Sequence, residues 1–372
     1  MEVLDPTTLR GKRVLLRASL NVPLEGGWVT NHFRLDESLK TIELLAKSGA
    51  RVIVCGHIGR EKTASLRPVW EALKTKTSLS VAFSDDVIGP AARSASEKLA
   101  DGDVLLLENL RRNEGEATND LLFAKKLAQL AEVYVNDAFS DSHRTHASIV
   151  GVPNLLPHAA GPNFARELSN IEPARTPASP SLAVVGGAKF MTKEPLIETL
   201  LNRYDQVVVG GALAHDFFVA QGLSVGRSLV SGALPSSAFL TNSKIILPHD
   251  VVVHDALKER VVRSVDDVRE SDTILDVGPH TVEALRPLVA KARFVLWNGP
   301  LGNFEQGFTE GTEALAALIA ESNATSVVGG GDTVASIERL GINKKFTHVS
   351  TAGGAMLQFI AEGTLPGIEA LR

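Results

Sequence analysis

Cysteine is nearly absent from this 372-residue sequence, which contains only Cys55. A single cysteine excludes an internal disulfide framework and any CxxC metal site. Cys55 ends the apolar run that starts at residue 52, so we expect a small buried hydrophobe and not a nucleophile. No apolar run approaches the roughly 20 residues of a membrane-spanning helix. Residues 1–5 also lack the basic and apolar regions of a signal peptide. These absences predict a cytoplasmic protein without a membrane partner.

The chain also lacks a large net charge and the two common sequence motifs for binding nucleotide phosphates. The net charge of −5 gives no reason to expect nucleic acid as a partner. The chain has no GxxxxGK[ST] segment, which excludes a P-loop hydrolase of nucleotides. It also has no GxGxxG segment followed by a ribose-binding acid, which argues against a Rossmann-type dehydrogenase.

The chain is long enough for more than one hydrophobic core, because single cores usually stop growing below this length. Short β-branched or leucine-rich runs alternate with amphipathic stretches, which is typical of βαβ units and parallel sheets. The runs lie at residues 13–16, 51–54, 104–107, 133–135, 182–185, 206–209, 294–296 and 326–328. The proline-rich segment 171–180 is the clearest linker, and residues 164–171 are expected to form a short connecting helix before it.

Basic side chains follow the strands of the first half. Ligands of open α/β sheets bind at the carboxyl ends of strands, so these positions are the ones to examine for chemistry. The residues in question are Arg17, Asn21, His57, Arg60, Asn109, Arg111, His143, Arg144 and His146. Any one of the arginines is adequately explained as a solvated surface residue. The same choice after four strands predicts a cleft for a small polyanion.

Glycines follow the strands of the second half. The turns are Gly186-Gly187-Ala188-Lys189, Gly210-Gly211, Trp297-Asn298-Gly299-Pro300 and Gly329-Gly330-Gly331-Asp332. A single Gly-Gly pair is most often just a tight strand-to-helix turn. Together with an ammonium at Lys189 and a carboxylate at Asp332, these turns favour backbone binding of a nucleotide and its phosphates.

These segments resemble those of the phosphoglycerate kinase family over nearly the whole chain. The matching segments are Arg17-Ala18-Ser19-Leu20-Asn21-Val22-Pro23, Gly56-His57-Ile58-Gly59-Arg60, Leu107-Glu108-Asn109-Leu110-Arg111, Asn136-Asp137-Ala138-Phe139, His143-Arg144-Thr145-His146, the glycine turns named above, and Leu365-Pro366-Gly367. The resemblance implies an α/β fold of two Rossmann-like three-layer domains with parallel sheets joined by a hinge. It implies a phosphoglycerate-binding domain at 1–161, a connecting helix and linker at 162–180, and a nucleotide-binding domain at 181–353. A tail from about 354 to 372 would pack back on the first domain.

The resemblance also implies an activity and roles for individual residues. The activity is reversible phosphoryl transfer from 1,3-bisphosphoglycerate to Mg-ADP, giving 3-phosphoglycerate and ATP, by a monomer acting in glycolysis and gluconeogenesis. Phosphoglycerate would be bound by Ser19, Asn21, Arg34, His57, Arg60, Arg111 and Arg144. Nucleotide would be bound by Gly186, Gly187, Lys189, Lys193, Gly210, Gly211, Asn298, Glu305, Gly330, Gly331, Asp332 and Thr333, with Asp332 on Mg²⁺. The catalytic group would be Arg34, Lys189, Lys193, Gly331 and Gly354. We expect Thr192 to be the N-cap of the helix that carries Lys193.

Several positions depart from the family pattern. Ser19 stands where the family usually has an Asp that accepts a hydrogen bond from the substrate hydroxyl, and Ser140-Asp141 replaces Gly-Thr. Serine can still form that bond, or Glu61, Asp141 or a bound water has taken over the role. Ala352 replaces a common glycine, which matters if the position needs a positive φ. The alternative to an active kinase is a non-catalytic paralogue that retains nucleotide binding.

Overall fold

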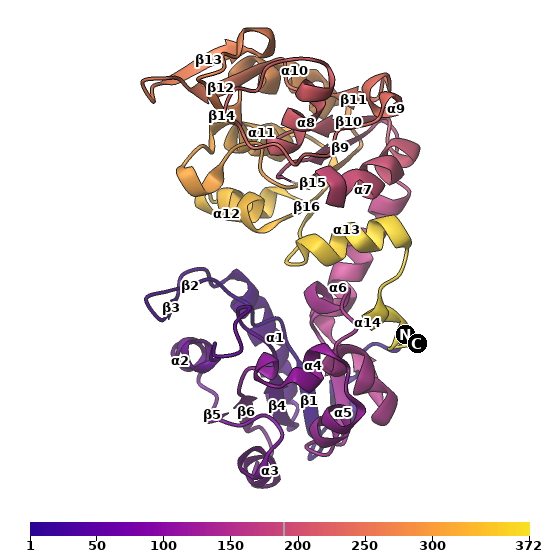
Figure 1. The fold of residues 1–372 in the computed structure, drawn as a ribbon. Helices are drawn as coiled ribbons and strands as arrows, with labels where there is room; N and C mark the ends of the chain where they lie inside the picture. Colours follow the sequence, from indigo (N-terminus) through magenta and orange to yellow (C-terminus); the bar gives the residue numbers. More distant parts are fainter. Residues whose placement is uncertain (189) are drawn as a thin grey trace. The chain divides into compact units, whose positions relative to one another are not determined.

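The computed structural model describes residues 1–188 and 190–372. Its contacts divide the chain into two compact units, shown by sequence colour in Figure 1. Unit 1 consists of Met1–Ser169 and Thr364–Arg372, and unit 2 consists of Asn170–Gly363. The expected domain borders at 161 and 181 stay predictions. Lys189, for which the sequence predicts a nucleotide contact, lies outside the described residues.

Unit 1 is built on a parallel sheet with the strand order β5-β6-β4-β1-β7-β8. The strands are β1 (Arg13–Arg17), β4 (Arg51–Cys55), β5 (Val81–Ser84), β6 (Val104–Leu107), β7 (Val133–Asn136) and β8 (His158–Ala160). The four central strands confirm the four runs predicted for the first half. Val14, Leu15 and Leu16 are all fully buried. Since successive residues of a strand face opposite sides, both faces of this sheet are covered.

Helices α1 and α2 pack on one face of the unit 1 sheet. The helices of unit 1 are α1 (Phe33–Lys47), α2 (Arg67–Lys76), α3 (Pro90–Glu97), α4 (Glu114–Ala117), α5 (Leu121–Ala128) and α14 (Pro366–Glu369), and α6 (Pro162–Ile171) contains the border between the units. Leu35, Leu39 and Ile42 form an apolar stripe on α1 and share a core cluster with Val14. Fully burying such a side chain contributes about 1.5 to 3 kcal/mol. Gly49 follows the C-cap with a φ of +83°, the left-handed conformation that ends many helices.

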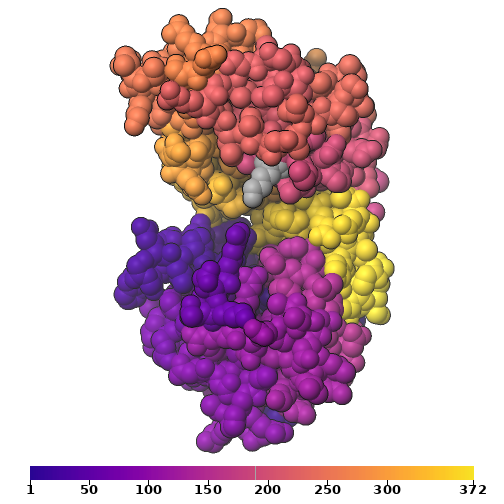
Figure 2. Space-filling model, in the orientation of Figure 1, coloured from indigo at the N-terminus to yellow at the C-terminus, as the bar shows by residue number. Residues whose placement is uncertain are grey.

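The last residues of the chain belong to unit 1. The backbone N–H of Gly367 donates to the Ser142 carbonyl at 2.8 Å. A Cβ on Gly367 would lie 2.6 Å from the Ser142 side chain, so a glycine is needed for this approach. Figure 2 shows the yellow end of the chain against the magenta surface of unit 1. The start of the expected returning tail instead forms α13 (Gly353–Glu362), which belongs to unit 2.

Unit 2 is built on a second parallel sheet, with the order β11-β10-β9-β15-β16-β17. Its strands are β9 (Ser181–Val185), β10 (Gln206–Val209), β11 (Ile245–Ile246), β15 (Phe294–Asn298), β16 (Thr325–Gly329) and β17 (His348–Val349). The four predicted runs of the second half are confirmed as the central strands. An antiparallel sheet of β12 (Asp250–His254), β13 (Arg260–Ser264) and β14 (Thr273–Val277) has no counterpart in the predicted pattern.

The helices of unit 2 follow its strands. They are α7 (Phe190–Arg203), α8 (Ala212–Ala220), α9 (Ser237–Leu240), α10 (Pro279–Lys291), α11 (Glu310–Glu321), α12 (Gly331–Arg339) and α13. The predicted N-cap at Thr192 is wrong, because α7 already begins at Phe190 and Pro195 lies inside the helix. Ala352 is the N-cap of α13 with a φ of −117°, so its side chain meets no strain from a positive φ.

Candidate functional site

The basic side chains of unit 1 come from four neighbouring strands. Strands β6, β4, β1 and β7 are adjacent and parallel, so their carboxyl ends lie side by side. Ser19 and Asn21 follow β1, His57 and Arg60 follow β4, and Arg111 follows β6 in the 3₁₀ turn η2 (Leu110–Arg112). Arg144 follows β7, just after the 3₁₀ turn η3 (Phe139–Asp141). The basic rim, as we call it, consists of this set together with Arg17 of β1, Arg34 of α1, His143 and His146.

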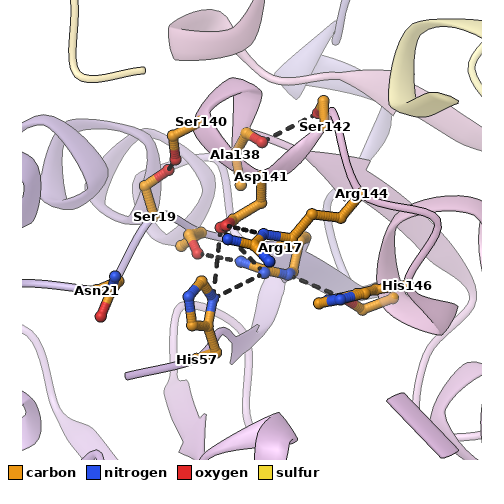
Figure 3. Close-up of polar contacts among 12 residues, drawn as sticks. Arg17, Ser19, Asn21, His57, Ala138, Ser140, Asp141, Ser142, Arg144 and His146 are labelled. Atoms are coloured by element: carbon orange, nitrogen blue, oxygen red, sulfur yellow. Dashed lines mark hydrogen bonds and ion pairs between the residues drawn. The ribbon is translucent and has the colours of Figure 1, made fainter. Parts of the chain in front are cut away.

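Arg17 is the buried centre of the basic rim. This last residue of β1 is fully buried, and its guanidinium makes contacts on three sides. Nη2 donates to Asp141 Oδ2 at 3.1 Å, Nε donates to Ser148 Oγ at 3.0 Å, and Nη1 donates to the Ala18 carbonyl at 2.7 Å. Figure 3 shows Arg17, Asp141 and His57 pointing toward one another. A buried arginine with this many partners is held rigidly.

Asp141 is a buried carboxylate among these cations. Its Oδ2 also lies 3.5 Å from His57 Nδ1, and its Oδ1 lies 3.9 Å from Arg144 Nε. Burial alone raises the pKa of the Asp141 carboxyl, but the neighbouring His57, Arg17 and Arg144 outweigh it and hold that pKa below its ordinary value. Asp141 is therefore ionised at neutral pH.

The histidines of the basic rim are neutral at neutral pH. Burial, assisted by nearby arginines, lowers the pKa of His57 to about 3. Burial and Arg144 lower the pKa of His146 to about 4, and the same two causes lower the pKa of His143. The positive charge of the basic rim at pH 7 therefore comes from its arginines.

The remaining members of the basic rim meet around the turn after β4. Asn21 Oδ1 accepts from the Gly59 N–H at 2.9 Å, and the Asn21 carbonyl accepts from Arg34 Nη1 at 2.8 Å. Arg111 donates from Nη1 to the Gly59 carbonyl. Arg60 is exposed. These contacts bring Asn21, Arg34 and Arg111 together, as the sequence predicts.

The Ser19 side chain contacts Ser140, the residue that precedes Asp141 in the sequence. The hydroxyls of Ser19 and Ser140 lie 2.8 Å apart, and both residues are drawn beside Asp141 in Figure 3. Of the acids considered as replacements for a carboxylate at position 19, Glu61 is exposed and Asp141 is buried in the basic rim. A carboxylate thus already lies next to the Ser19–Ser140 pair.

Unit 2 contains a cavity of about 380 Å³ at the ends of its strands. Gly187, Gly211, Glu305 and Asp332, all predicted nucleotide contacts, line it. Apolar walls come from Phe218, Leu229, Pro248, Val251, Ile274 and Leu275. A cavity of this size with apolar walls and a few polar groups is suited to a nucleobase and ribose.

Close packing explains the presence of glycine at some positions that the sequence predicts to bind nucleotide. A Cβ on Gly186 would lie 2.2 Å from the Pro300 carbonyl oxygen, and one on Gly210 would lie 2.5 Å from Leu301. Gly211 has a φ of +61°, and a Cβ there would lie 2.8 Å from the Gly187 nitrogen. Tight turns therefore explain Gly186 and Gly210, whereas Gly187 and Gly211 also line the cavity.

Two helix N-termini meet beside unsatisfied polar groups. A Cβ on Gly353, the first residue of α13, would lie 3.0 Å from the nitrogen of Gly330, the N-cap of α12. Asn298 Nδ2 and Thr333 Oγ1 lie here, are buried and have no hydrogen-bond partner among the described residues. Buried donors are nearly always satisfied, and converging helix N-termini favour an anion. We call this arrangement of two helix N-termini, Asn298 and Thr333 the anion cradle.

Gly331 and Gly354 border empty space at the anion cradle. Each lies in the first turn of its helix, and a Cβ on either would meet no atom within 4 Å among the described residues. Neither has a positive φ. Neither packing among the described residues nor backbone conformation therefore explains the glycines at these two positions.

Lys193 points toward the glycine turn after β9. Its Nζ donates to the Gly186 carbonyl at 2.8 Å, and burial lowers the pKa of this ammonium to about 8. A negatively charged ligand at this turn would favour the charged form. Lys193 therefore places a half-buried donor at the glycine turn after β9.

Asp332 and Glu305 share the cavity. Burial and the Glu305 carboxylate raise the pKa of Asp332, and a cation placed there would relieve the repulsion. Asp332 is not the helix cap, because the N-cap of α12 is Gly330. No cluster of three or more His, Cys, Asp or Glu suited to a metal occurs in the described part of the chain. Mg²⁺ characteristically needs only one or two protein carboxylates plus substrate phosphates, so Asp332 fits such a site.

The sequence placed Arg17 among the basic residues of the predicted polyanion cleft but did not assign it to phosphoglycerate binding. It treated Asp141 as a departure from the family pattern and as one of three possible replacements for the carboxylate missing at position 19. The available signal was the end of the strand itself, where a charged residue directly follows three apolar ones. The apolar cavity walls gave no such signal, because their residues come from separate loops and strands.

The two parallel sheets, the basic rim and the glycine-rich cavity are together typical of an α/β enzyme that transfers phosphoryl groups. The family model described as phosphoglycerate kinase matches residues 4–363. A phosphoglycerate kinase of Methylorubrum extorquens is 43% identical over 99% of this chain and 97% of its own length. One from Rhodospirillum centenum is 42% identical over 100% and 99%. The chain belongs to the phosphoglycerate kinase family.

Solved structures agree with this assignment. The phosphoglycerate kinase of Pyrococcus horikoshii has a TM-score of 0.89 at 31% identity and covers 100% of this chain and 98% of its own. That of Coxiella burnetii has a TM-score of 0.79 at 37% identity, with 98% and 96% covered. Within residues 1–188 and 190–372, no helix combines the length and apolar character that crossing a membrane requires.

Proposed function

We propose that this chain catalyses the reversible transfer of a phosphoryl group between 1,3-bisphosphoglycerate and Mg-ADP, giving 3-phosphoglycerate and ATP. The single observation that carries the proposal is the anion cradle. There, buried polar groups lack partners and two glycines leave space at helix N-termini. Membership of the phosphoglycerate kinase family supports the choice of substrates.

On the substrate side, phosphoglycerate binds to the basic rim. The guanidinium groups of Arg60, Arg111 and Arg144 hold its phosphate, since planar forks match phosphate oxygens. Asn21, His57 and Arg34 contribute further donors, and Ser19 lies beside them. Because the histidines are neutral, they act as hydrogen-bond donors and not as charges.

On the nucleotide side, the base and ribose occupy the cavity of unit 2, with Glu305 on the ribose hydroxyls. The phosphate tail extends over the glycine turns toward Asn298, Gly330 and Thr333. Asp332 holds Mg²⁺, which enters with the nucleotide and neutralises phosphate charge when bound. Lys189, outside the described residues, and Lys193 add ammonium groups to the same phosphates.

The chemical step needs no side-chain nucleophile. A carboxylate oxygen and a nucleotide phosphate oxygen are the attacking and leaving groups, so catalysis is positioning and charge stabilisation. Arg34, Lys189, Lys193 and the backbone N–H groups at Gly331 and Gly354 surround the transferring group. These residues belong to both units, so a hinge at 162–180 and near Ser350-Thr351 is part of the proposal. We further propose a cytoplasmic monomer.

A coupled assay of ATP formation from 1,3-bisphosphoglycerate and Mg-ADP tests this function. We expect turnover by the wild type and a loss of roughly 10²- to 10³-fold in kcat for Lys189→Ala, as for removal of one donor to transition-state charge. The exposed Lys344 provides a matched control, because Lys344→Ala should leave kcat unchanged. An inactive wild type that still binds Mg-ADP would instead establish the non-catalytic alternative.

A further inference from the structure

The contacts of Arg17 fix the position of a proton on His57. Arg17 Nη2 lies 3.3 Å from His57 Nδ1 and 3.1 Å from Asp141 Oδ2. A guanidinium is always protonated, and Nη2 carries two hydrogens and no acceptor. Nη2 can therefore donate one hydrogen to the carboxylate and the other to the ring. A proton on Nδ1 would place two donors against each other.

The competing arrangement has the poorer geometry. If Nδ1 carried the proton, its acceptor would be Asp141 Oδ2 at 3.5 Å, which is long for a charge-assisted hydrogen bond. Asp141 Oδ2 already accepts from Arg17 at the shorter distance. When His57 Nδ1 is an acceptor, Arg17, Asp141 and His57 Nδ1 all have a hydrogen-bond partner. In a neutral imidazole, the proton then resides on Nε2.

Arg17 is itself unable to turn away from the ring. Its Nε donates to Ser148 Oγ, and that hydroxyl donates to the buried carboxylate Glu116 at 2.6 Å. Its Nη1 is bonded to the Ala18 carbonyl. A chain of buried hydrogen bonds that leaves few members unsatisfied is rigid. The Nη2 hydrogens therefore have a fixed direction, toward Asp141 and His57.

The second nitrogen of the ring, Nε2, takes no part in the contacts with Arg17 and Asp141. Within residues 1–188 and 190–372, the polar contacts of His57 with Arg17 and Asp141 use Nδ1 and leave Nε2 without a hydrogen-bond partner. The charged groups that act on this ring are Asp141, Arg17, Arg111 and Arg144. A hydrogen on Nε2 would add a donor to a ring that already experiences the charges of Arg111 and Arg144.

We propose that Arg17 is a positioning residue that holds His57 as the neutral Nε2–H tautomer, so that His57 donates this hydrogen to bound phosphoglycerate. The proposal deepens the proposed function and rests on it for the identity of the ligand. The lowered pKa of His57 agrees with a neutral ring. Asp141 then balances the buried guanidinium and does not hold the imidazole proton.

Nitrogen-15 NMR of the histidine-labelled full chain tests the tautomer directly, with His57→Gln used to assign the signal. We expect an unprotonated Nδ1 and a protonated Nε2 at pH 7, both free and with 3-phosphoglycerate. A proton on Nδ1, or on both nitrogens, would overturn the proposal. This result is independent of catalysis, so it stands apart from failure of the proposed function, which would show as no binding of 3-phosphoglycerate.

Two substitutions of His57 by an amide side chain test whether the Nε2 hydrogen is donated to 3-phosphoglycerate. The amide of Gln reaches the position of Nε2, whereas the amide of Asn reaches only that of Nδ1. We expect His57→Gln to retain 3-phosphoglycerate affinity within a fewfold and His57→Asn to lose about tenfold or more, the worth of a hydrogen bond to a charged group. The KM for Mg-ADP should be unchanged in both. Equal losses, or better binding by His57→Asn, would contradict the proposed donor.

Arg17→Lys tests the positioning role. A lysine has one ammonium and cannot hold Asp141 and His57 Nδ1 together in this fork, so we expect the Nδ1-protonated tautomer to appear in the same NMR measurement. An unchanged tautomer in a folded Arg17→Lys protein would remove Arg17 from this role. If this variant does not fold, the wild-type spectrum and the Gln and Asn pair still decide the proposal.

Discussion

The basic rim of unit 1 and the anion cradle of unit 2 present different kinds of hydrogen-bond donors. The basic rim uses charged side chains fixed by one another, with Arg17 and Asp141 buried at its centre. The anion cradle of unit 2 uses helix N-termini, two orphaned side-chain donors and empty space at Gly331 and Gly354. Side chains suit a small substrate with charges at fixed positions, whereas backbone N–H groups suit a phosphate that must pass closely.

Among the tests of this contrast between the units, the largest expected effect comes from filling the space of the anion cradle. Gly331→Ala and Gly354→Ala should each lower kcat by about tenfold to a hundredfold, because a methyl group would displace the transferring phosphate from its donors. The free energy of unfolding should stay the same or rise by about 0.4 to 1 kcal/mol, since alanine fits a helical first turn. Steady-state kinetics and urea unfolding measure the two quantities. A stable variant with wild-type kcat would mean that the space has no catalytic use.

The second prediction distinguishes the binding of Mg²⁺ from the binding of the nucleotide. Asp332→Asn should weaken Mg-ADP binding by about tenfold while changing metal-free ADP binding much less, because a hard cation prefers a carboxylate to an amide. Calorimetric titration with and without Mg²⁺ measures both. Asp267, an exposed acid in the turn η7 (Val265–Asp267), offers the control Asp267→Asn. Equal losses for both forms of the nucleotide would exclude Asp332 as the magnesium ligand.

A third effect tests the charge balance of the basic rim. Ser19→Asp should weaken 3-phosphoglycerate binding by about 1 kcal/mol, because the new carboxylate would lie beside Asp141 in an anion site. Ser19→Asp with Asp141→Ser should recover the affinity. The KM for Mg-ADP should not change. If Ser19→Asp instead bound 3-phosphoglycerate more tightly, serine at position 19 would simply lack a substrate contact that an aspartate makes.

These predictions rest on features that the sequence reveals to different degrees. The central strands and the residues after them could be predicted, because apolar runs followed by Arg, His or Gly are local signals. The short edge strands β5 and β8 and the antiparallel sheet around β12 could not, since their pattern is weak and their pairing is nonlocal. The start of α7 was missed because Thr192 and Pro195 imitate a helix start inside the helix.

The candidate site was predicted unevenly for a similar reason. Arg111 and Asn21 follow strands and were found from position alone. Asp141 became meaningful only when its distances to Arg17 and His57 were known. The reason for glycine at Gly331 also depends on space that no sequence pattern records.

The smallest expected effect is on how the free energy of unfolding changes with pH. The pKa of His57 is about 3 in the folded chain, against roughly 6.5 unfolded. Between these values the unfolded chain binds the additional proton, so this residue makes stability fall as pH falls. Asp276 acts oppositely, because burial raises its pKa to about 7. The wild type should therefore lose about 1 kcal/mol more than His57→Gln between pH 6 and 5, as measured by urea unfolding. Equal losses would mean that His57 is protonated in the folded state.

Amide NMR mapping of the two ligands tests the contrast between the units most directly. Titration of the full chain with 3-phosphoglycerate should shift the amides of Asn21, Gly59 and Arg111, and titration with Mg-ADP should shift those of Gly187, Gly211 and Asp332. The account predicts these two separate sets. Shifts from both ligands in one unit only, or from 3-phosphoglycerate at the cavity of unit 2, would contradict it.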